Sequence, residues 1–187
     1  MGYAVNYPEN VENLCCGQMY HSAGNQLQQN RVQADLTTGI QGAQLVLMDN
    51  SSCAGFAQQS NLPVMDINQF LVERLVRSRL IHRYQRVALH IDCSTAKHSF
   101  NLEFIAILRL CAYEVVIAEG IKCCGFAGDK GFTTPELNAS SLSGLAPQVS
   151  DCEIGVTFNR SCQIGLNQHS GIKYISFVEL ILDCFRT

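Results

Sequence analysis

The sequence lacks the features that three common classes of protein require. It has no run of lysine and arginine among aromatic residues, its formal net charge is -3 and its pI is near 5.9, so a nucleic-acid-binding surface is not expected. Arg109 and Glu114 interrupt its most apolar segment, residues 104–118, whereas a membrane span needs roughly 20 apolar residues in succession. The N-terminal residues contain neither the basic region nor the apolar core of a signal peptide.

The chain is instead rich in cysteine, with ten in 187 residues. Because no signal peptide is recognisable, the expected compartment is the cytoplasm, with attachment to the inner face of the membrane only through partners. Thiols stay reduced in the cytoplasm, and cysteine-dense chains of that compartment more often bind metal or carry out redox chemistry than form disulfides. With 47% hydrophobic residues, the chain can bury a core as one domain or two small ones.

The hydrophobic pattern indicates an α/β fold with mainly parallel sheets. From about Leu45 onward, short apolar runs alternate with segments of helical periodicity, as in successive βαβ units. The expected strands are residues 45–49, 86–92, 114–119, 153–158 and 173–177. Helices are expected over residues 67–75, 100–111 and 135–145, and after Ser161 and Phe177.

A weak internal repeat divides the chain. Two Cys-Cys-Gly triplets, at residues 15–17 and 123–125, each precede a lone cysteine, and 37 residues separate Cys16 from Cys53 while 38 separate Cys124 from Cys162. The sequence therefore predicts two related halves, residues 1–85 and 86–187. No segment rich in proline, glycine or serine lies between them, so we expect the halves to pack together.

Four cysteines of the second half each follow a predicted strand: Cys93, Cys123, Cys124 and Cys162. Because ligands bind at the carboxyl ends of parallel strands, we expect these cysteines to converge on one cofactor. Four thiolates typically hold an iron-sulfur cluster, and Gly125 would let the backbone approach its inorganic sulfides closely. Zinc in a tetrahedral four-thiolate site is the alternative.

Three other cysteines have simpler interpretations. Cys111 and Cys184 lie on apolar helical faces and are predicted to be core residues. Cys152 follows polar residues and is predicted to be an unligated surface thiol.

The histidines and one glycine-rich loop are weaker candidates. His90 lies on a predicted strand and is expected to be a satisfied core or edge residue, whereas His21, His98 and His169 lie nearer the cysteine loops, where each could donate a hydrogen bond to a cluster sulfur. Residues 125–131 match neither the dinucleotide fingerprint nor a P-loop, so we interpret them as a tight loop around a cluster.

The second Cys-Cys-Gly triplet opens a stretch with a specific resemblance. Residues 123–139, CCGFAGDKGFTTPELNA, closely resemble a segment near the C-terminus of fused flavin and iron-sulfur D-lactate dehydrogenases. The resemblance extends to residues 89–94, 159–171 and 14–17, and so covers nearly the whole chain. The broader family is the tandem cysteine-rich CCG domain, also found in the cysteine-rich subunit of heterodisulfide reductase and in iron-sulfur subunits of lactate and glycolate oxidation systems.

The resemblance implies a set of ligands for a 4Fe-4S cluster. In the second half the set is Cys93, Cys123, Cys124 and Cys162, whereas only Cys15, Cys16 and Cys53 match in the first half. Relatives carry a further cysteine-bearing segment upstream, and they have Cys-Asp-x-Ser-Pro-Cys where residues 48–53 are Met-Asp-Asn-Ser-Ser-Cys. A complete cluster is therefore not expected in the first half, which looks degenerate and truncated at its N-terminus.

The resemblance also implies a function, which is electron transfer within an oxidoreductase. A flavin-linked dehydrogenase of D-lactate or another D-2-hydroxyacid would pass electrons from FAD, held in a partner domain or subunit, through the cluster to a quinone or another acceptor. The chain is not expected to be an active enzyme alone. Two alternatives are a zinc-stapled structural or interaction domain and a thiol-disulfide module like heterodisulfide reductase.

Overall fold

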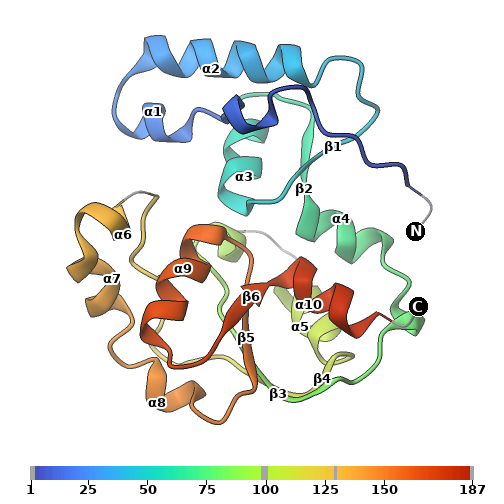
Figure 1. Cartoon of the computed structure of the whole chain (residues 1–187), viewed down its shortest axis with the longest axis vertical. Coiled ribbons are helices and arrows are strands. Elements are labelled where there is room, and N and C mark those ends of the chain that lie inside the picture. Colours follow the sequence, from blue (N-terminus) through green and yellow to red (C-terminus); the bar gives the residue numbers. More distant parts are fainter. Residues whose placement is uncertain (1–2, 98–100, 129, 186–187) are drawn as a thin grey trace. The chain divides into compact units, whose positions relative to one another are not determined.

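The computed structural model describes residues 3–97, 101–128 and 130–185 of the chain (Figure 1). The chain divides into two compact units, which we call unit 1 (Met1–Phe70) and unit 2 (Leu71–Thr187). The division lies inside helix α4 (Ile67–Arg74). The boundary predicted near residue 85 falls within unit 2, and the relatedness of the two predicted halves stays a prediction.

Unit 1 is a small layer of helices on a two-stranded parallel sheet. Strand β1 (Val46–Met48) pairs with β2 (Val64–Asp66), and Val46 lies opposite Val64. The helical segments are η1 (Val11–Asn13), α1 (Gln18–Ser22), α2 (Gln26–Gly39), α3 (Ser51–Gln59) and the start of α4. Asn50 caps α3 by accepting hydrogen bonds from the N–H groups of Ser52 and Cys53, at 3.1 and 3.3 Å.

Unit 2 is built on a four-stranded parallel sheet of order β4-β3-β5-β6. The strands are β3 (Tyr84–Leu89), β4 (Ala112–Val116), β5 (Ile154–Thr157) and β6 (Tyr174–Ser176). The first strand of the unit is central and the chain moves outward from it in both directions, so the direction of winding reverses between β3 and β5. In doubly wound sheets this reversal opens the ligand-binding crevice outside the carboxyl ends of the strands.

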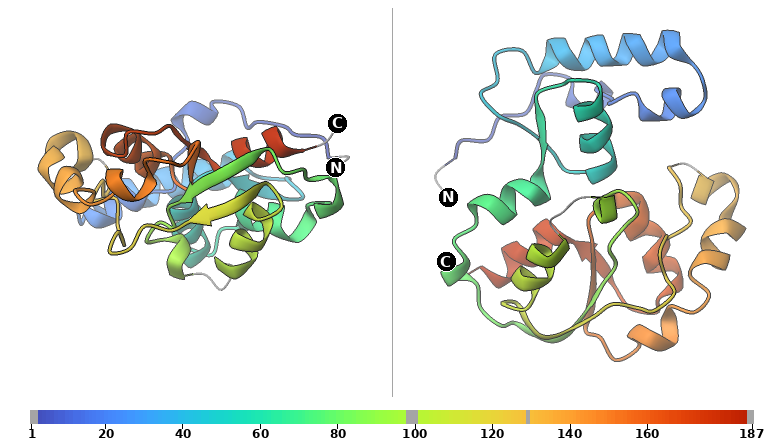
Figure 2. Two further views of the ribbon diagram at one scale, coloured as in Figure 1. Left: turned by 90° about the horizontal axis from the view of Figure 1, so that it is seen from below. Right: turned by 180° about the vertical axis from the view of Figure 1, so that it is seen from behind.

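The helical segments of unit 2 can be followed in Figures 1 and 2. They are η2 (Arg77–Arg79), η3 (Thr95–Lys97), α5 (Asn101–Leu108), α6 (Lys130–Thr133), α7 (Pro135–Ser141), α8 (Ala146–Val149), α9 (Arg160–His169) and α10 (Phe177–Cys184). Side chains alternate between the two faces of a strand, so each face of the sheet contributes to a different core.

The two cores of unit 2 differ in what they contain. Val87, Leu89 and Val156 point into the first core, where residues of α4, α5 and α10 pack against them. Ala88 points into the second core, with Phe126, Leu142 and Leu145 from the segment after β4. The second core also contains Cys124, Cys152 and Cys162. Three of the ten cysteines are thus packed on the same side of the sheet.

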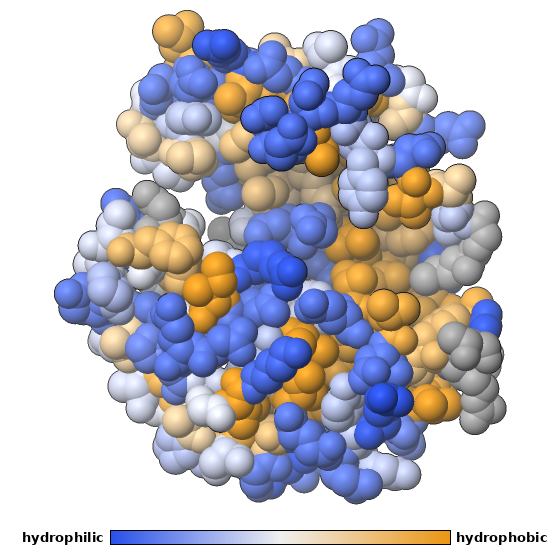
Figure 3. Space-filling view, viewed as in Figure 1, coloured by the Kyte–Doolittle hydropathy of each residue, from blue (hydrophilic) through white to orange (hydrophobic). Residues whose placement is uncertain are grey.

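The structure confirms the expected mixed α/β architecture with parallel sheets. All five predicted strands are present, and β2 is an additional strand that the pattern did not predict. Within the described parts of the chain, every helix is too short or too polar to cross a membrane. Figure 3 shows polar residues and groups of apolar residues on the face that it draws. The exposed apolar side chains of unit 2 include Leu102, Phe132 and Leu182.

Candidate functional site

The second Cys-Cys-Gly triplet lies on the loop after β4 and folds into a tight turn. The N–H of Gly125 donates to the Cys123 sulfur at 3.3 Å, and the N–H of Phe126 donates to the Cys124 sulfur. Gly125 has a φ of 71°, in the left-handed region. Each sulfur of the doublet therefore accepts a hydrogen bond from the amide two residues further along, and at Cys124 this bond lowers the pKa of the thiol.

Cys162 comes from the next loop, after β5. Asn159 precedes α9, so Cys162 is the third residue of a ten-residue helix. The positive end of the helix dipole favours a negative charge there. Cys162 is 6% exposed and lies in the same core as Cys124.

Cys124 and Cys162 are in direct contact. Their sulfurs lie 3.0 Å apart, and all ten cysteines are free thiols. The hydrogen bond from Cys162 lowers the pKa of the Cys124 thiol to about 7, with a further contribution from the Phe126 amide that works against burial. The same contact raises the pKa of Cys162, and burial raises it further. The contact therefore makes Cys124 more acidic than an ordinary cysteine and Cys162 less acidic.

Cys93 approaches the other member of the doublet. Its side chain hydrogen-bonds Cys123, and both are exposed. Burial of part of its surface is the largest cause that raises the Cys93 pKa, followed by the negative charges of Cys123, Asp92 and Cys124. The charge of Cys93 also raises the pKa of Cys162. The four predicted cysteines thus interact with one another, as a Cys93–Cys123 pair and a Cys124–Cys162 pair.

A buried carboxylate shapes the loop that carries Cys93. Asp92 is fully buried and accepts hydrogen bonds from the N–H groups of Ser94 and Thr95, at 3.1 and 2.9 Å, and from both of their hydroxyls. Asn159 donates to the Ser94 hydroxyl at 2.9 Å. The loops after β3 and β5 are therefore tied together across the point where the sheet reverses its winding.

The donor set fits a thiolate-bound metal group in kind. Thiolates are the ligands that iron-sulfur clusters and structural zinc prefer, and four thiols lie here as two pairs, three of them on loops and Cys162 on α9. In the described part of the chain, no three cysteine, histidine or carboxylate side chains are already arranged around an ion. The Cys124 and Cys162 sulfurs, 3.0 Å apart, are closer than two ligands of one ion, because two sulfurs on one zinc lie roughly 3.8 Å apart, and a cluster needs a wider separation. Binding would require these two sulfurs to move apart.

Gly125 contributes to the site through its backbone. A Cβ at this position would lie 2.4 Å from the Leu137 carbonyl oxygen and 2.5 Å from the Ser141 hydroxyl oxygen. The missing side chain therefore permits close packing of the turn against α7. The backbone N–H of Gly125 is directed to the Cys123 sulfur. The predicted approach of Gly125 to inorganic sulfides stays a prediction.

Unit 1 contains a similar arrangement of three cysteines. The N–H of Gly17 donates to the Cys15 sulfur at 3.4 Å, and Cys16 and Cys53 share a hydrogen bond. That bond lowers the Cys16 pKa to about 6 and raises the Cys53 pKa. Cys53 is the third residue of α3, after the capping Asn50. Met48 is the last residue of β1.

The remaining predicted cysteines are all buried. Cys111 and Cys184 have no exposed surface, which confirms them as core residues, and they also hydrogen-bond one another. The prediction that Cys152 is a surface thiol was wrong, because it is only 5% exposed. Its N–H donates to the Val149 carbonyl at the end of α8, and its side chain is part of the second core.

The histidines differ in their relation to the cysteines. His90 is buried as expected, but Nε2 has no hydrogen-bond partner among the described residues, so the prediction that it is satisfied was wrong. His21 is exposed and hydrogen-bonds Gln29 at 3.2 Å. His169 ends α9, about 10 Å along the helix axis from Cys162. His98 lies outside the described residues.

Sequence reasoning missed three polar residues of the site. Besides Asp92, these are Asn138 of α7, which donates to the Cys124 carbonyl, and Thr157, the last residue of β5. Gly165 lies on α9 one turn after Cys162, and a Cβ there would meet the Asn138 amide at 2.4 Å. Asn138 therefore packs between the loop that carries Cys124 and the helix α9 that carries Cys162.

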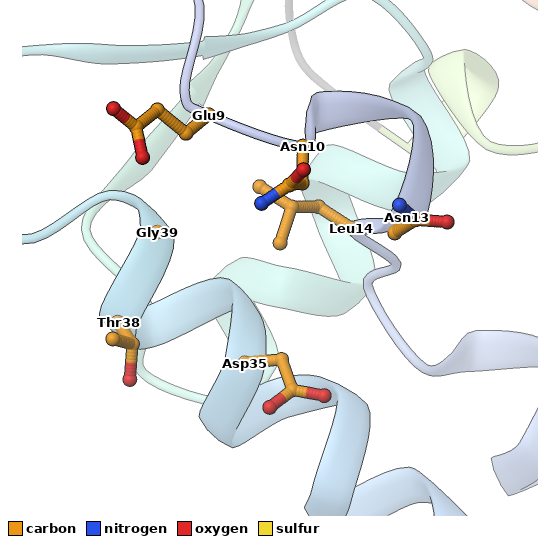
Figure 4. A pocket seen from close by; sticks show the side chains of 7 residues that line it. All are labelled: Glu9, Asn10, Asn13, Leu14, Asp35, Thr38 and Gly39. Atoms are coloured by element: carbon orange, nitrogen blue, oxygen red, sulfur yellow. The ribbon is translucent and has the colours of Figure 1, made fainter.

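A pocket of about 600 Å³ lies elsewhere, in unit 1. Figure 4 shows that Glu9 comes from the N-terminal segment and that Asp35 and Thr38 come from α2. No cysteine is among the described residues that line it, which are Glu9, Asn10, Asn13, Leu14, Asp35, Thr38 and Gly39. This pocket is separate from the thiol chemistry.

Comparison with known proteins gives a family match for part of unit 2. No curated protein matches the chain. Among solved structures, the crystal structure of arylmalonate decarboxylase is 12% identical, with 86% of this chain and 74% of that chain covered, at a TM-score of 0.31; a likeness of this size carries no argument. Residues 87–166 match the family of the CCG cysteine-rich domain, and this segment contains Cys93, Cys123, Cys124 and Cys162.

Proposed function

We propose that unit 2 binds an iron-sulfur cluster of the 4Fe-4S type and transfers electrons through it. The observation that supports this most is that four thiols, three on loops and Cys162 on α9, lie at the carboxyl edge of a parallel sheet, where the winding reverses. The ligands would be Cys93, Cys123, Cys124 and Cys162. A cluster bound there would accept and release single electrons.

The residues of the site are suited to hold thiolates. The Phe126 amide stabilises charge on Cys124, and the α9 dipole favours charge at Cys162. Cys93 and Cys123 are exposed, whereas Cys124 and Cys162 are buried. A bound group would therefore have one side toward solvent, through which an electron-transfer partner could approach it.

The proposed physiological role is electron transfer in a flavin-linked dehydrogenase of D-lactate or another D-2-hydroxyacid. The resemblance of residues 123–139 to such enzymes supports it. The hydroxyacid would lose two electrons and two protons to become the 2-oxoacid, and a quinone or another acceptor would be reduced in its place. FAD and the substrate site would belong to a partner domain or subunit, in the cytoplasm or at the inner face of the membrane.

We also propose that the two units are related by the predicted repeat. In each, a parallel strand leads to an asparagine, a helix with cysteine as its third residue, and a second strand in register. In each, the second cysteine of the doublet hydrogen-bonds the helical cysteine. Unit 1 contains three such cysteines among its described residues, so we expect a complete cluster in unit 2 only.

The test is anaerobic purification and reconstitution, followed by a visible spectrum and by iron, sulfide and zinc analysis. Wild-type protein should show a broad visible band with stoichiometric iron and sulfide. Cys124→Ser should lose both, because a hydroxyl replaces a buried ligand. Cys152→Ala is the matched control, since Cys152 is also buried in the second core but has Arg86, Glu114 and Tyr174 as its charged and polar neighbours. It should keep the cluster.

Two results would count against the proposal. Stoichiometric zinc without colour after attempted reconstitution would instead assign a structural metal site to the thiols. Equal loss of iron in Cys152→Ala and Cys124→Ser would show that the band depends on core packing rather than on the proposed ligands.

A further inference from the structure

Among the buried side chains of unit 2 that have an atom without a hydrogen-bond partner, two lie at the carboxyl ends of the central strands. His90 is 4% exposed and Thr157 is 0% exposed. Neither His90 Nε2 nor Thr157 Oγ1 has a partner among the described residues. A buried polar group without a partner is destabilising, so such groups in a native protein indicate a missing partner or a functional role.

The strand register places these two residues side by side. Ala88 pairs with Gly155 and Leu89 with Val156, and the His90 N–H donates to the Val156 carbonyl at 2.9 Å. One step further in the same register, His90 is opposite Thr157. Both are at the carboxyl ends of the two central strands, where the winding reverses.

Alternation along the strands also decides which face they occupy. Leu89 and Val156 point into the first core, so His90 and Thr157, one residue further on each strand, point to the opposite face. That face carries the second core, which contains Cys124 and Cys162. Two unsatisfied polar side chains and the contacting thiol pair therefore share one face of the sheet, at its carboxyl edge.

The charge of Asp92 acts both on His90 and on the cysteines of the site. The negative charge of Asp92 raises the pKa of His90 and also those of Cys93, Cys124 and Cys162. For His90, burial outweighs this effect and lowers the pKa. The lowered pKa favours the neutral imidazole, which carries one N–H that it can donate without bringing a charge into the site.

We propose that His90 and Thr157 form a floor beneath the Cys124–Cys162 pair and donate hydrogen bonds, through Nε2–H and the hydroxyl, to the sulfur of the group that the thiols bind. The proposal rests on the proposed cluster and adds two positioning residues that are not ligands. When the Cys124 and Cys162 sulfurs move apart to bind the cluster, sulfur atoms of the bound group become acceptors for the hydrogen bonds that His90 and Thr157 lack.

The expected effect is on the reduction potential. Hydrogen bonds to sulfur stabilise the more negative, reduced state and so raise the potential. Loss of one donor should lower the ratio of reduced to oxidised protein at a fixed potential by about tenfold, which is about 59 mV for a one-electron couple. Ligand loss would remove the cluster altogether, so the two effects are distinguishable.

The experiment compares reconstituted wild-type protein with Thr157→Val, Thr157→Ser and His90→Phe. Iron and sulfide content is measured first, and then an electron paramagnetic resonance redox titration is made on each protein. Thr157→Val removes only the hydroxyl at nearly constant volume, and Thr157→Ser keeps it. We expect a lower potential in Thr157→Val and His90→Phe at unchanged iron content, a wild-type-like potential in Thr157→Ser, and a nitrogen hyperfine coupling from ¹⁵N-labelled histidine that His90→Phe abolishes.

The outcomes separate this inference from the proposed function. Equal potentials in all four proteins with equal iron content would overturn the hydrogen bonds and leave the cluster proposal standing. A wild-type protein that binds no iron would overturn both. A structural role alone would change the melting temperature of the metal-free variants without changing the potential, and that result would also overturn the inference.

Discussion

Two glycines of the loop after β4, Gly125 and Gly128, have the same backbone conformation and different surroundings. Gly125 and Gly128 have φ values of 71° and 73°. A Cβ would lie 2.4 Å from the Leu137 carbonyl oxygen at Gly125, whereas nothing lies within 4 Å of one at Gly128. The left-handed conformation costs an alanine about 1–2 kcal/mol at either position, but only Gly125 adds a clash with the backbone of α7.

Gly125→Ala should therefore destabilise the protein more than Gly128→Ala. We expect a loss of about 2–5 kcal/mol in the free energy of unfolding for Gly125→Ala, since overpacking adds roughly 1–3 kcal/mol to the conformational cost. Gly128→Ala should lose only about 1–2 kcal/mol. Urea denaturation of the metal-free proteins measures both. Equal losses would show that the contact with α7 does not constrain the turn.

At the scale of single elements, α10 has the best-defined start in unit 2. The Ser176 hydroxyl accepts from the Glu179 N–H at 3.2 Å, and the Glu179 carboxylate accepts from the Ser176 N–H at 2.7 Å. The backbone hydrogen bond is the largest cause that lowers the Glu179 pKa. This capping box fixes the helix that places Phe177, Leu180 and Ile181 in the first core.

Ser176→Ala should cost about 1 kcal/mol of stability at neutral pH, as loss of a helix cap usually does. The contribution of Glu179 is complete above the ordinary glutamate pKa of about 4.3 and is lost as the pH falls through its lowered folded-state pKa. Ser176→Ala keeps the backbone N–H from which Glu179 accepts, so both proteins share this pH dependence, and the cost of losing the hydroxyl, which accepts from the Glu179 N–H, should persist in acid. The control is Ser143→Ala, whose hydroxyl only donates to the Ser140 carbonyl at an exposed position. A difference that disappears below pH 3 would contradict the capping explanation.

Local patterns predicted the elements better than their ends. The strand expected over residues 86–92 is β3, which ends at Leu89. Soon after it, the Asp92 carboxylate accepts from the N–H groups of Ser94 and Thr95, and the chain forms a turn there. Strand β2 was missed since its three residues follow Pro63 and are too few to show alternation. Proline at the first helical position correctly marked the start of α7.

The sequence predicted which cysteines belong to the candidate site, but not how their side chains are arranged. Spacing after strands indicated which cysteines face the carboxyl edge of the sheet, because this depends on chain order. The contact between Cys124 and Cys162, the burial of Cys152 and the adjacency of His90 and Thr157 depend on register and helix packing. No single-sequence pattern carries that information.

At the scale of the whole molecule, the segment that matches the CCG family is smaller than the unit that contains it. Residues 87–166 include all four proposed ligands of unit 2. They exclude β6, α10 and the first residues of β3. The first core of the unit therefore draws side chains from outside the matched segment, on both sides: Leu71, Val72, Leu75 and Leu80 before it, and Ile175, Phe177, Leu180, Ile181 and Cys184 after it.

We expect residues 71–187 to fold without unit 1 and residues 87–166 to fail to fold. The longer fragment keeps both cores, whereas the shorter one loses the edge strand and the helix that cover Val87, Leu89 and Val156. Each buried Leu, Ile or Phe contributes about 1.5–3 kcal/mol, so losing several exceeds the typical 5–15 kcal/mol stability of a domain. Amide hydrogen exchange should show protected β3 and β5 amides in the 71–187 fragment only. Protection of the same amides in the 87–166 fragment would mean that the matched segment is itself the folding unit, and that β6 and α10 are additions to it.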